Sequence, residues 1–326
     1  MLRKLLTAFA IAAPLLYHGL TFAQAPWPNK PVKVIVSGAA GSGTDIAARL
    51  VTEPLSKIFG QPFVIDNRAG ANGIIGTDAV AKAPADGYTL LFTYAAAQVV
   101  NQALYDKVPY DGAKDFAAIA QIGAGGNLLV VPPSMPVKDL KEFIAYVRSK
   151  PENALSYGSW GSGSGGHLSM EALKQQTGLK MQHIPYKSTA AANTDLIGGQ
   201  IQAAFSAMAS AMPLVQAGKM KAIAVSGPYR VSALPDVKTM TEQGVKFDLT
   251  AWYGMFAPAG TPPAIVNAIN KEVLKLINTP ETLALWKKTL GLSEVPLKTP
   301  EQFAETVRND VRDWGAIVRT GNIKAD

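Results

Sequence analysis

The sequence of 326 residues contains no cysteine. That absence excludes a disulfide framework, thiolate catalysis and cysteine-ligated metal sites, so the fold must be stabilised by its buried core. Histidine is almost as scarce, with three residues in the chain. Basic clusters are lacking too: the formal net charge is +7, yet no run of four Lys or Arg residues occurs. Dispersed positive charge argues against a nucleic acid partner and suits a small anion, which it attracts at long range.

The first residues have the pattern of a cleaved secretory signal. Residues 3–4 are basic, residues 5–16 are apolar, and the small residues Thr21 and Ala23 occupy the two positions that a signal peptidase reads. We therefore assign residues 1–23 to a signal peptide, with cleavage near Ala23. The apolar run is shorter than the ~20 residues of a membrane-spanning helix, so we expect a secreted protein.

The remaining chain of about 300 residues exceeds what one compact core usually holds, so we expect two domains. Short apolar runs alternate with helix-length amphipathic segments, which is typical of α/β architecture with largely parallel sheets. For the first helix, Thr44 or Asp45 is the expected N-cap and Gly60 the expected end. Strands are predicted at residues 32–36, 63–65, 88–93, 128–131, 155–157, 181–185, 203–205 and 222–226. Helices are predicted at residues 45–59, 74–83, 139–149, 168–177, 189–198, 263–277 and 300–319.

Two of the predicted strands end in a loop of glycine, serine and other small residues that opens directly into a helix. The segments are "VIVSGAAGSGTDIAAR" at 34–49 and "LSYGSWGSGSGGHLSM" at 155–170. A helix N-terminus leaves backbone N–H groups unpaired and carries a partial positive charge, so each loop is a potential anion site. Two such loops that face one another would hold both ends of a small dianion, or one carboxylate and a polar tail.

A nucleotide is the first alternative for the second loop. Residues 161–166 satisfy the spacing G-x-G-x-x-G, but the dinucleotide fingerprint also needs an acidic residue at the end of the following strand. That strand reads "MQHIPYK", with no acid, and no G-x-x-x-x-G-K-[ST] motif occurs. The sequence therefore disfavours a nucleotide and predicts no cofactor.

A secreted hydrolase is the second alternative. No G-x-S-x-G motif occurs, which removes the usual signature of an α/β-hydrolase. His167 nevertheless lies at the mouth of a helix close to Ser162 and Ser164, so a serine and His167 pair stays open as a catalytic arrangement. His167 and His183 are sixteen residues apart without a flanking carboxylate cluster, a spacing that predicts no metal site.

Several separated motifs occur in order from Trp27 to the C-terminal helices: "GSGTDIAARL", "DNRAGANG", "ADGYTLLF", "NQALYDKVPYD", "KDFAAI", "YGSWGSGSGGHLSME", "IPYKS", "LIGGQIQAAF", "LPDVKTMTEQG" and "FAPAGTPP". In this series the chain resembles the Bug-type, or TctC-like, extracytoplasmic solute-binding receptors of tripartite tricarboxylate transporters.

The resemblance implies a two-domain, periplasmic-binding-protein-like α/β fold (type II-like) with the ligand cleft between the domains. It places residues 27–127 plus 252–326 in domain 1 and residues 128–251 in domain 2, with hinge closure where the chain crosses. It further implies a periplasmic, monomeric protein that captures a small organic carboxylate without covalent chemistry. The expected partners are membrane subunits of the TctA and TctB type, or a sensor.

The resemblance also assigns binding residues. In the family the loop after the first strand presents backbone amides to the ligand, a role that falls here on Gly38, Ala39, Ala40, Gly41, Ser42, Gly43, Thr44 and Asp45. The same wall is completed by Gly70, Ala71 and the segment from Thr93 to Gln98. The facing wall is expected to contain Ser159, Trp160, Gly161, Ser162, Ser164, His167, Tyr186, Lys187 and Ser206.

Three departures from the family pattern bear on the ligand. The first loop often carries an aromatic residue and prolines where this chain has residues 38–40, whereas Trp160 stands where a small residue is common. Ser206 stands where many members have an aspartate, and without that carboxylate a ligand ammonium group would be buried unpaired. We therefore favour a di- or aromatic carboxylate over an amino acid, with Lys187 available to neutralise one carboxylate.

Overall fold

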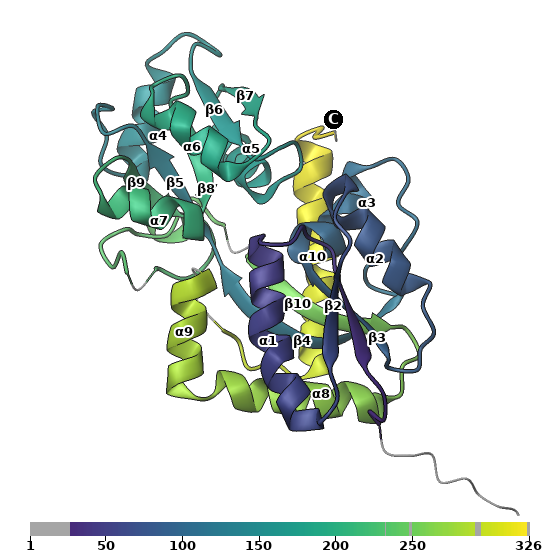
Figure 1. The fold of residues 1–326 in the computed structure, drawn as a ribbon. Helices are drawn as coiled ribbons and strands as arrows, with labels where there is room; N and C mark the ends of the chain where they lie inside the picture. Colours follow the sequence, from purple (N-terminus) through teal and green to yellow (C-terminus); the bar gives the residue numbers. More distant parts are fainter. Residues whose placement is uncertain (1–26, 232, 248–249, 291–294, 325–326) are drawn as a thin grey trace, which may run out of the picture.

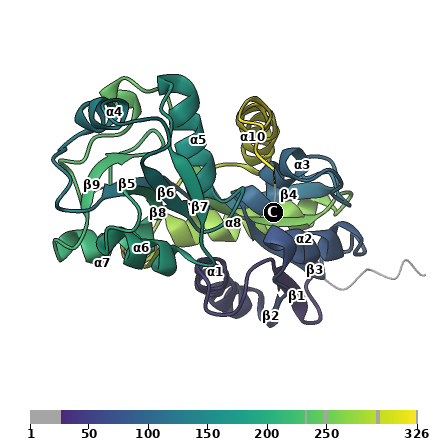
Figure 2. The same cartoon turned by 90° about the horizontal axis from the view of Figure 1, so that it is seen from above.

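The computed structural model describes residues 27–231, 233–247, 250–290 and 295–324, and the predicted signal peptide, residues 1–23, lies outside them. This part of the chain forms two lobes, each built on a five-stranded sheet with helices on both faces (Figures 1 and 2). Within these ranges, no helix is both long enough and apolar enough to cross a membrane.

The first lobe contains the sheet with strand order β2-β1-β3-β10-β4, and the second lobe the sheet with order β7-β6-β8-β5-β9. The strands are β1 (Val32–Val36), β2 (Phe63–Asn67), β3 (Thr89–Tyr94), β4 (Phe116–Gly125), β5 (Asn127–Val131), β6 (Ser156–Ser159), β7 (Gln182–Pro185), β8 (Ala203–Ala207), β9 (Lys221–Val225) and β10 (Ala251–Pro258). The helices are α1 (Gly43–Phe59), α2 (Ile74–Ala81), α3 (Asn101–Leu104), α4 (Leu140–Arg148), α5 (Gly165–Thr177), α6 (Thr189–Ile197), α7 (Met208–Gln216), α8 (Pro263–Ile277), α9 (Pro280–Leu290) and α10 (Pro300–Thr320), with short helical turns η1 (Ala71–Gly73), η2 (Ala96–Val100) and η3 (Thr241–Gln243).

Each sheet is mixed, because four of its five strands run in one direction, as expected, and one strand runs against them. β1 pairs in parallel with β2 and β3, and β6 with β7 and β8, but β10 runs antiparallel to both of its neighbours and so does β5. These two strands enter their sheet from the other lobe. A strand that enters in this way starts at the edge where its neighbours end, so it has to run against them.

The two chain crossings lie side by side. Gly126 joins β4 to β5, and Ala251, the first residue of β10 after the second crossing, pairs with Gly125. Ser226, which follows β9, packs on the first crossing, because a Cβ on Gly126 would overlap its carbonyl oxygen. The N–H of Asn127 donates to Ser226 Oγ at 2.8 Å, and the N–H of Ser226 donates to the Asn127 carbonyl at 2.9 Å. The first sheet thus takes its strands from residues 32–125 and 251–258 and the second from 127–225, while the expected domain boundaries stay a prediction.

Helix α1 shows how the local sequence sets an element. Its buried face repeats at helical spacing, with Ala47, Val51 and Leu55 fully buried against the first sheet. Gly60 adopts the left-handed conformation with φ 67° and ends the helix, as predicted. The N-cap is Ser42, whose side chain accepts from the N–H of Asp45, so the expected cap at Thr44 or Asp45 is wrong.

Long C-terminal elements connect the lobes. Helix α10 packs against the first lobe through Phe303, whose ring lies 5.3 Å from that of Trp252 in β10. At its other end the carbonyl of Ile317 accepts a hydrogen bond from Gln175 Nε2 in α5, which belongs to the second lobe. Helix α10 therefore contacts both lobes, and its position depends on both.

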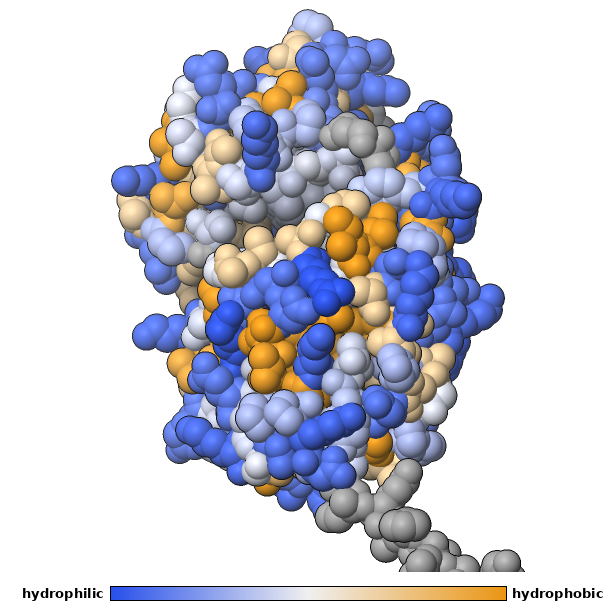
Figure 3. All heavy atoms as spheres, turned by 45° about the vertical axis from the view of Figure 1, so that its right-hand side comes forward, coloured by the Kyte–Doolittle hydropathy of each residue, from blue (hydrophilic) through white to orange (hydrophobic). Residues whose placement is uncertain are grey.

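Apolar side chains on the surface are dispersed. On the face drawn in Figure 3, apolar residues form small groups separated by hydrophilic ones. The most exposed large apolar side chains include Val64 in β2, Ile75 in α2 and Leu285 in α9.

Candidate functional site

The first predicted loop, residues 37–45, lies where β1 ends and α1 begins, and it is open to solvent. Ala39, Ala40, Gly41 and Gly43 are exposed, whereas Thr44 and Asp45 are buried. Ser42 caps α1 with its side chain, and its carbonyl accepts from Ile46. The first N–H groups of an α-helix have no acceptor within the helix, so the N-terminus of α1 directs backbone donors toward this loop.

Asp45 stabilises this loop from within. Its carboxylate accepts from the N–H of Gly41 at 2.9 Å, from Asn67 Nδ2 at 3.0 Å, and from the Arg49 guanidinium at 3.0 and 3.1 Å. Burial opposes its charged form, but the hydrogen bonds from Arg49, Gly41 and Asn67 outweigh that effect and lower the pKa of Asp45. The carboxylate therefore stays ionised and fixes the loop conformation.

The other predicted residues of the first wall lie beside this loop at the carboxyl end of the sheet. Ser37 directly follows β1, and Thr93 lies near the end of β3. Their hydroxyl groups share a hydrogen bond of 2.6 Å. The turn that contains Gly70 and Ala71 has positive φ at both residues. Gln98 is fully buried and donates to the carbonyl of Gly112 at 2.7 Å, so its side chain points away from the loop and into the lobe.

The second predicted loop, residues 159–165, repeats the design of the first. Ser164 caps α5, whose first residue is Gly165 and not Leu168 as predicted, and its Oγ accepts from the N–H of His167. The N–H of Gly163 donates to His167 Nδ1 at 3.0 Å, as the N–H of Gly41 donates to Asp45 in the first loop. Gly41 and Gly163 have matching φ values of 77° and 73°. Both loops therefore use a left-handed glycine, a serine cap and a side-chain acceptor four residues after the glycine.

The two histidines lie together behind the second loop. Their rings stack with centroids 3.8 Å apart and planes 10° apart, and the ring of Tyr157 stacks on His183 at 5.0 Å. His183 Nε2 contacts Ser159 Oγ at 2.7 Å. Because His167 Nδ1 already accepts from a backbone N–H, a neutral His167 carries its proton on Nε2 and has no second lone pair. The serine and His167 pair that the sequence left open therefore lacks a free base at His167.

The indole of Trp160, a residue of the second loop, packs against the start of α5, the helix that follows the loop. A Cβ on Gly166 would come within 2.5 Å of the indole and 2.6 Å of the carbonyl oxygen of Phe205, and a Cβ on Gly165 within 3.5 Å of the indole and 3.3 Å of Asn127 Nδ2. The ring thus covers the first turn of α5 and the end of β8, near the chain crossing. Two glycines in succession leave room for it.

The remaining residues of the second wall are spread over three environments. The Tyr186 hydroxyl donates to Asp195 at 2.7 Å, and burial together with this bond raises the pKa of Tyr186 to about 12. Lys187 is exposed. Ser206 is 1% exposed and donates to Asn193 Oδ1 at 2.9 Å, so its hydroxyl faces α6 inside the lobe.

The second loop contacts the first lobe. A Cβ on Gly163 would collide with the side chain of Leu104 at the end of α3 in the first lobe. Loop 159–165 therefore packs against the first lobe near the crossings, and Figure 2 shows α5 and α3 on the same side of the molecule.

Tyr253, which the sequence did not indicate as a site residue, contacts the first loop. A Cβ on Gly43 would come within 2.6 Å of the Tyr253 hydroxyl, so this hydroxyl from β10 lies at the N-terminus of α1. Burial raises the pKa of Tyr253, which keeps the hydroxyl protonated and able to donate. Only the antiparallel pairing of β10 with β3, in which Tyr253 lies opposite Tyr94, brings it there.

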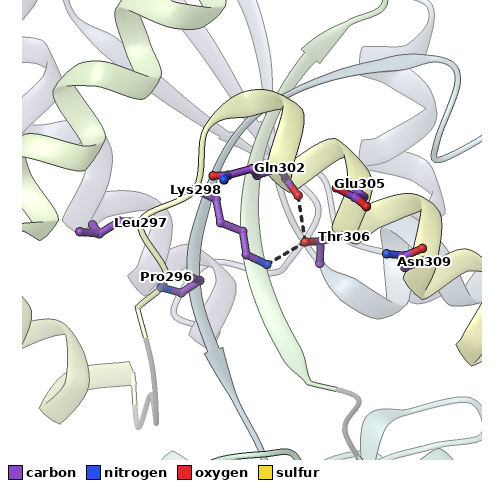
Figure 4. Close-up of a pocket in the computed structure, with 7 residues that line it drawn as sticks. All are labelled: Pro296, Leu297, Lys298, Gln302, Glu305, Thr306 and Asn309. Carbon is purple, nitrogen blue, oxygen red and sulfur yellow. Dashed lines mark hydrogen bonds between the residues drawn. The ribbon is translucent and has the colours of Figure 1, made fainter.

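Two surface cavities lie elsewhere. One of about 450 Å³ is formed by residues 296–298 and α10 (Figure 4), where Lys298 Nζ donates to Thr306 Oγ1 at 2.7 Å. The other, of about 470 Å³, is lined by residues from Gln102 to Asp115. Neither is lined by any of the predicted binding residues.

Known proteins place the chain in a family. Residues 47–323 match the sequence profile of TctC, the tripartite tricarboxylate transporter family receptor. Among solved structures, R. palustris Rpa4515 with adipate is 33% identical with a TM-score of 0.80, over 91% of this chain and 99% of that one. The periplasmic binding protein BugD is 32% identical with a TM-score of 0.76, over 91% and 100%.

A third structure, MatC of Rhodopseudomonas palustris with bound malate, is 32% identical with a TM-score of 0.74, over 90% of this chain and 100% of that one. These matches confirm the α/β fold of the periplasmic binding proteins and the resemblance drawn from the motifs. The chain belongs to the TctC family of tripartite tricarboxylate transporter receptors.

Proposed function

We propose that this protein is a periplasmic receptor that binds a small dicarboxylate between its two lobes and presents it to transporter membrane subunits of the TctA and TctB type, or to a sensor. The observation that carries the proposal is the pair of matching helix N-terminal loops, residues 37–45 and 159–165, at the facing edges of the two lobes. Each offers uncharged donors, which bind a carboxylate reversibly because they cost little to desolvate when no ligand is present.

The ligand class follows from the family and from the polar groups at the site. Rpa4515 and MatC, which share about a third of their residues with this chain, were solved with adipate and malate. Ser206 has a hydroxyl where many family members have an aspartate, and that hydroxyl is already engaged by Asn193. A ligand ammonium group would therefore find no carboxylate at this position, which favours simple diacids over amino acids, and exposed Lys187 supplies a nearby cation.

Ligand capture would proceed by closure of the lobes. We assign domain 1 to residues 27–127 plus 252–326 and domain 2 to residues 128–251, with the hinge at the paired crossings beside Gly126 and Ala251. Residues 1–23 would direct export and be removed near Ala23, and the mature protein would act as a monomer. Trp160, which lies over the end of β8, would form an aromatic wall against the carbon chain of the acid.

A thermal-shift screen followed by calorimetry tests this function. Adipate and malate should raise the melting temperature and aspartate should not. A ligand at 100 times its Kd stabilises the folded state by ~2.7 kcal/mol, which is a shift of about 5 °C for a chain of this size. If none of the acids shifts the melting temperature or releases heat on titration, the proposed function is wrong.

A further inference from the structure

The turn from Gly70 to Gly73, between β2 and α2, has an unusual backbone. Four successive residues have positive φ: Gly70 at 124°, Ala71 at 45°, Asn72 at 49° and Gly73 at 84°. The left-handed region is unfavourable for residues that carry a Cβ, and two such residues in succession rarely persist without support. Ala71 and Asn72 must therefore be held by interactions with the rest of the fold.

Asn72 is held by two side chains from distant parts of the chain. Its Nδ2 donates to Asn101 Oδ1 at 2.8 Å, and Asn101 Nδ2 donates back to the Asn72 carbonyl at 3.0 Å. The Tyr94 hydroxyl donates to Asn72 Oδ1 at 3.1 Å. Asn101 is fully buried at the start of α3, and burial raises the pKa of Tyr94, which keeps that hydroxyl a donor. The interactions are uncharged and reciprocal, so they fix both the side chain and the backbone of Asn72.

The turn is packed directly against the first loop. A Cβ on Gly73 would come within 2.7 Å of Ala97 Cβ and 3.4 Å of Ser37 Cβ, and a Cβ on Gly76 within 3.0 Å of Ser37 Cα. Ser37 begins the loop of residues 37–45. Any change of backbone conformation at residues 70–73 would therefore displace Ser37 and the loop that we propose to bind one end of the ligand.

We infer that Asn101 and Tyr94 are positioning residues, which hold the Gly70–Gly73 turn in its left-handed conformation before a ligand arrives. The inference rests on the proposed function for its consequence: a turn that is already ordered needs no ordering on binding, and this raises affinity. Asn101 itself need not touch the ligand, because it acts through Asn72.

Hydrogen exchange of the ligand-free protein tests the positioning role directly. In the Asn101→Ala variant, amides of residues 70–73, including the Gly73 N–H that donates to Gly70 O at 2.9 Å, should exchange about ten-fold faster or more. Asn270→Ala is the matched control, because Asn270 is also a buried amide that donates to two carbonyls, those of Ile119 and Lys298. It should lower the melting temperature without changing exchange at the turn. Unchanged exchange at residues 70–73 in Asn101→Ala would overturn the inference.

Binding separates this inference from the proposed function. With adipate as the probe, Asn101→Ala should raise the Kd about ten-fold, whereas Asn270→Ala should leave the Kd within about two-fold of the wild type. Both variants should have a lower melting temperature than the wild type. Equal Kd values for Asn101→Ala and the wild type would refute the effect on affinity. If the wild type binds no acid in the screen, the proposed function fails, while the exchange result still decides whether Asn101 holds the turn.

Discussion

Replacement of Asp310 by asparagine should change how the stability of the protein depends on pH. Asp310 is 8% exposed in α10, and Trp252 Nε1 donates to its Oδ2 at 2.6 Å. Burial raises the pKa of Asp310 to about 6, although the Trp252 hydrogen bond and the charge of Lys298 act in the opposite direction. The folded protein therefore binds this proton more tightly than the unfolded chain, in which the group titrates near its ordinary value of about 3.9.

The size of the effect follows from the difference between the two pKa values. A raised carboxyl pKa favours folding while the group is protonated, so the stability from this group is greatest below about pH 4 and is lost as the pH rises through about 6. A difference of about two pKa units corresponds to about 3 kcal/mol between these limits. In Asp310→Asn the Oδ1 atom can still accept from Trp252 and no proton is exchanged, so the contribution of this position becomes independent of pH.

Urea unfolding of the ligand-free protein at pH 4, 5, 6 and 7.5, followed by tryptophan fluorescence, measures this difference. The free energy of unfolding of Asp310→Asn minus that of the wild type should rise by about 2.4 kcal/mol from pH 4 to pH 7.5, because the unfolded carboxyl is already about half ionised at pH 4. Glu152→Gln, at an exposed carboxylate, is the control and should leave the profile parallel to the wild type. A pH-independent difference for Asp310→Asn would refute the assignment of a raised pKa to this group.

Three further predictions concern the crossings and the second loop. Gly126→Ala should destabilise the protein by about 3 kcal/mol or more, because its Cβ overlaps the Ser226 carbonyl; an unchanged urea midpoint would contradict this. Ser164→Ala should cost about 1 kcal/mol through the lost N-cap and weaken acid binding in calorimetry, whereas an unchanged Kd would show that the loop does not bind the ligand. Trp160→Phe should remove most of the change in tryptophan fluorescence that adipate causes in the wild type. If the variant shows the same change as the wild type, Trp160 lies away from the ligand.

The elements that could be predicted from the sequence are those with a clear period. The first strand, residues 32–36, and the helix at 263–277 have the predicted bounds. The strand is a short apolar run that is followed by a loop of small residues, and the helix begins at a proline and repeats its apolar residues at helical spacing. β4 was missed because "FAAIAQIGAG" mixes small residues without alternation, and α7 because its segment contains Pro213 and lacks a polar face. The N-terminus of α5 was placed three residues late, because the serine cap outweighs the low helix propensity of Gly165 and Gly166.

The candidate site likewise has features that follow from the local sequence and features that do not. Both loops could be located, since a glycine and serine segment between a strand and a helix is a local feature. The roles of Asn101 and Tyr253 could not be predicted, because each depends on contacts between segments far apart in the chain: Asn101 reaches Asn72, 29 residues away, and Tyr253 reaches Gly43 from β10. Side-chain direction was equally out of reach, as Gln98 and Ser206 show by pointing into their own lobes.

The two loops share one backbone design but differ in charge, and this difference bears on how a diacid would lie. In "GSGTD" the acceptor for the glycine N–H is the Asp45 carboxylate, whose charge is offset by Arg49 at 3.0 Å. In "GSGGH" the acceptor is the His167 ring nitrogen, which must be unprotonated to accept and so adds no negative charge. The helix N-terminus at the second loop therefore acts on a ligand without an opposing buried anion. In the binding mode that we propose, a carboxylate would gain more at the second loop, and the first loop, with its Tyr253 hydroxyl, would suit the end of the ligand that carries less charge.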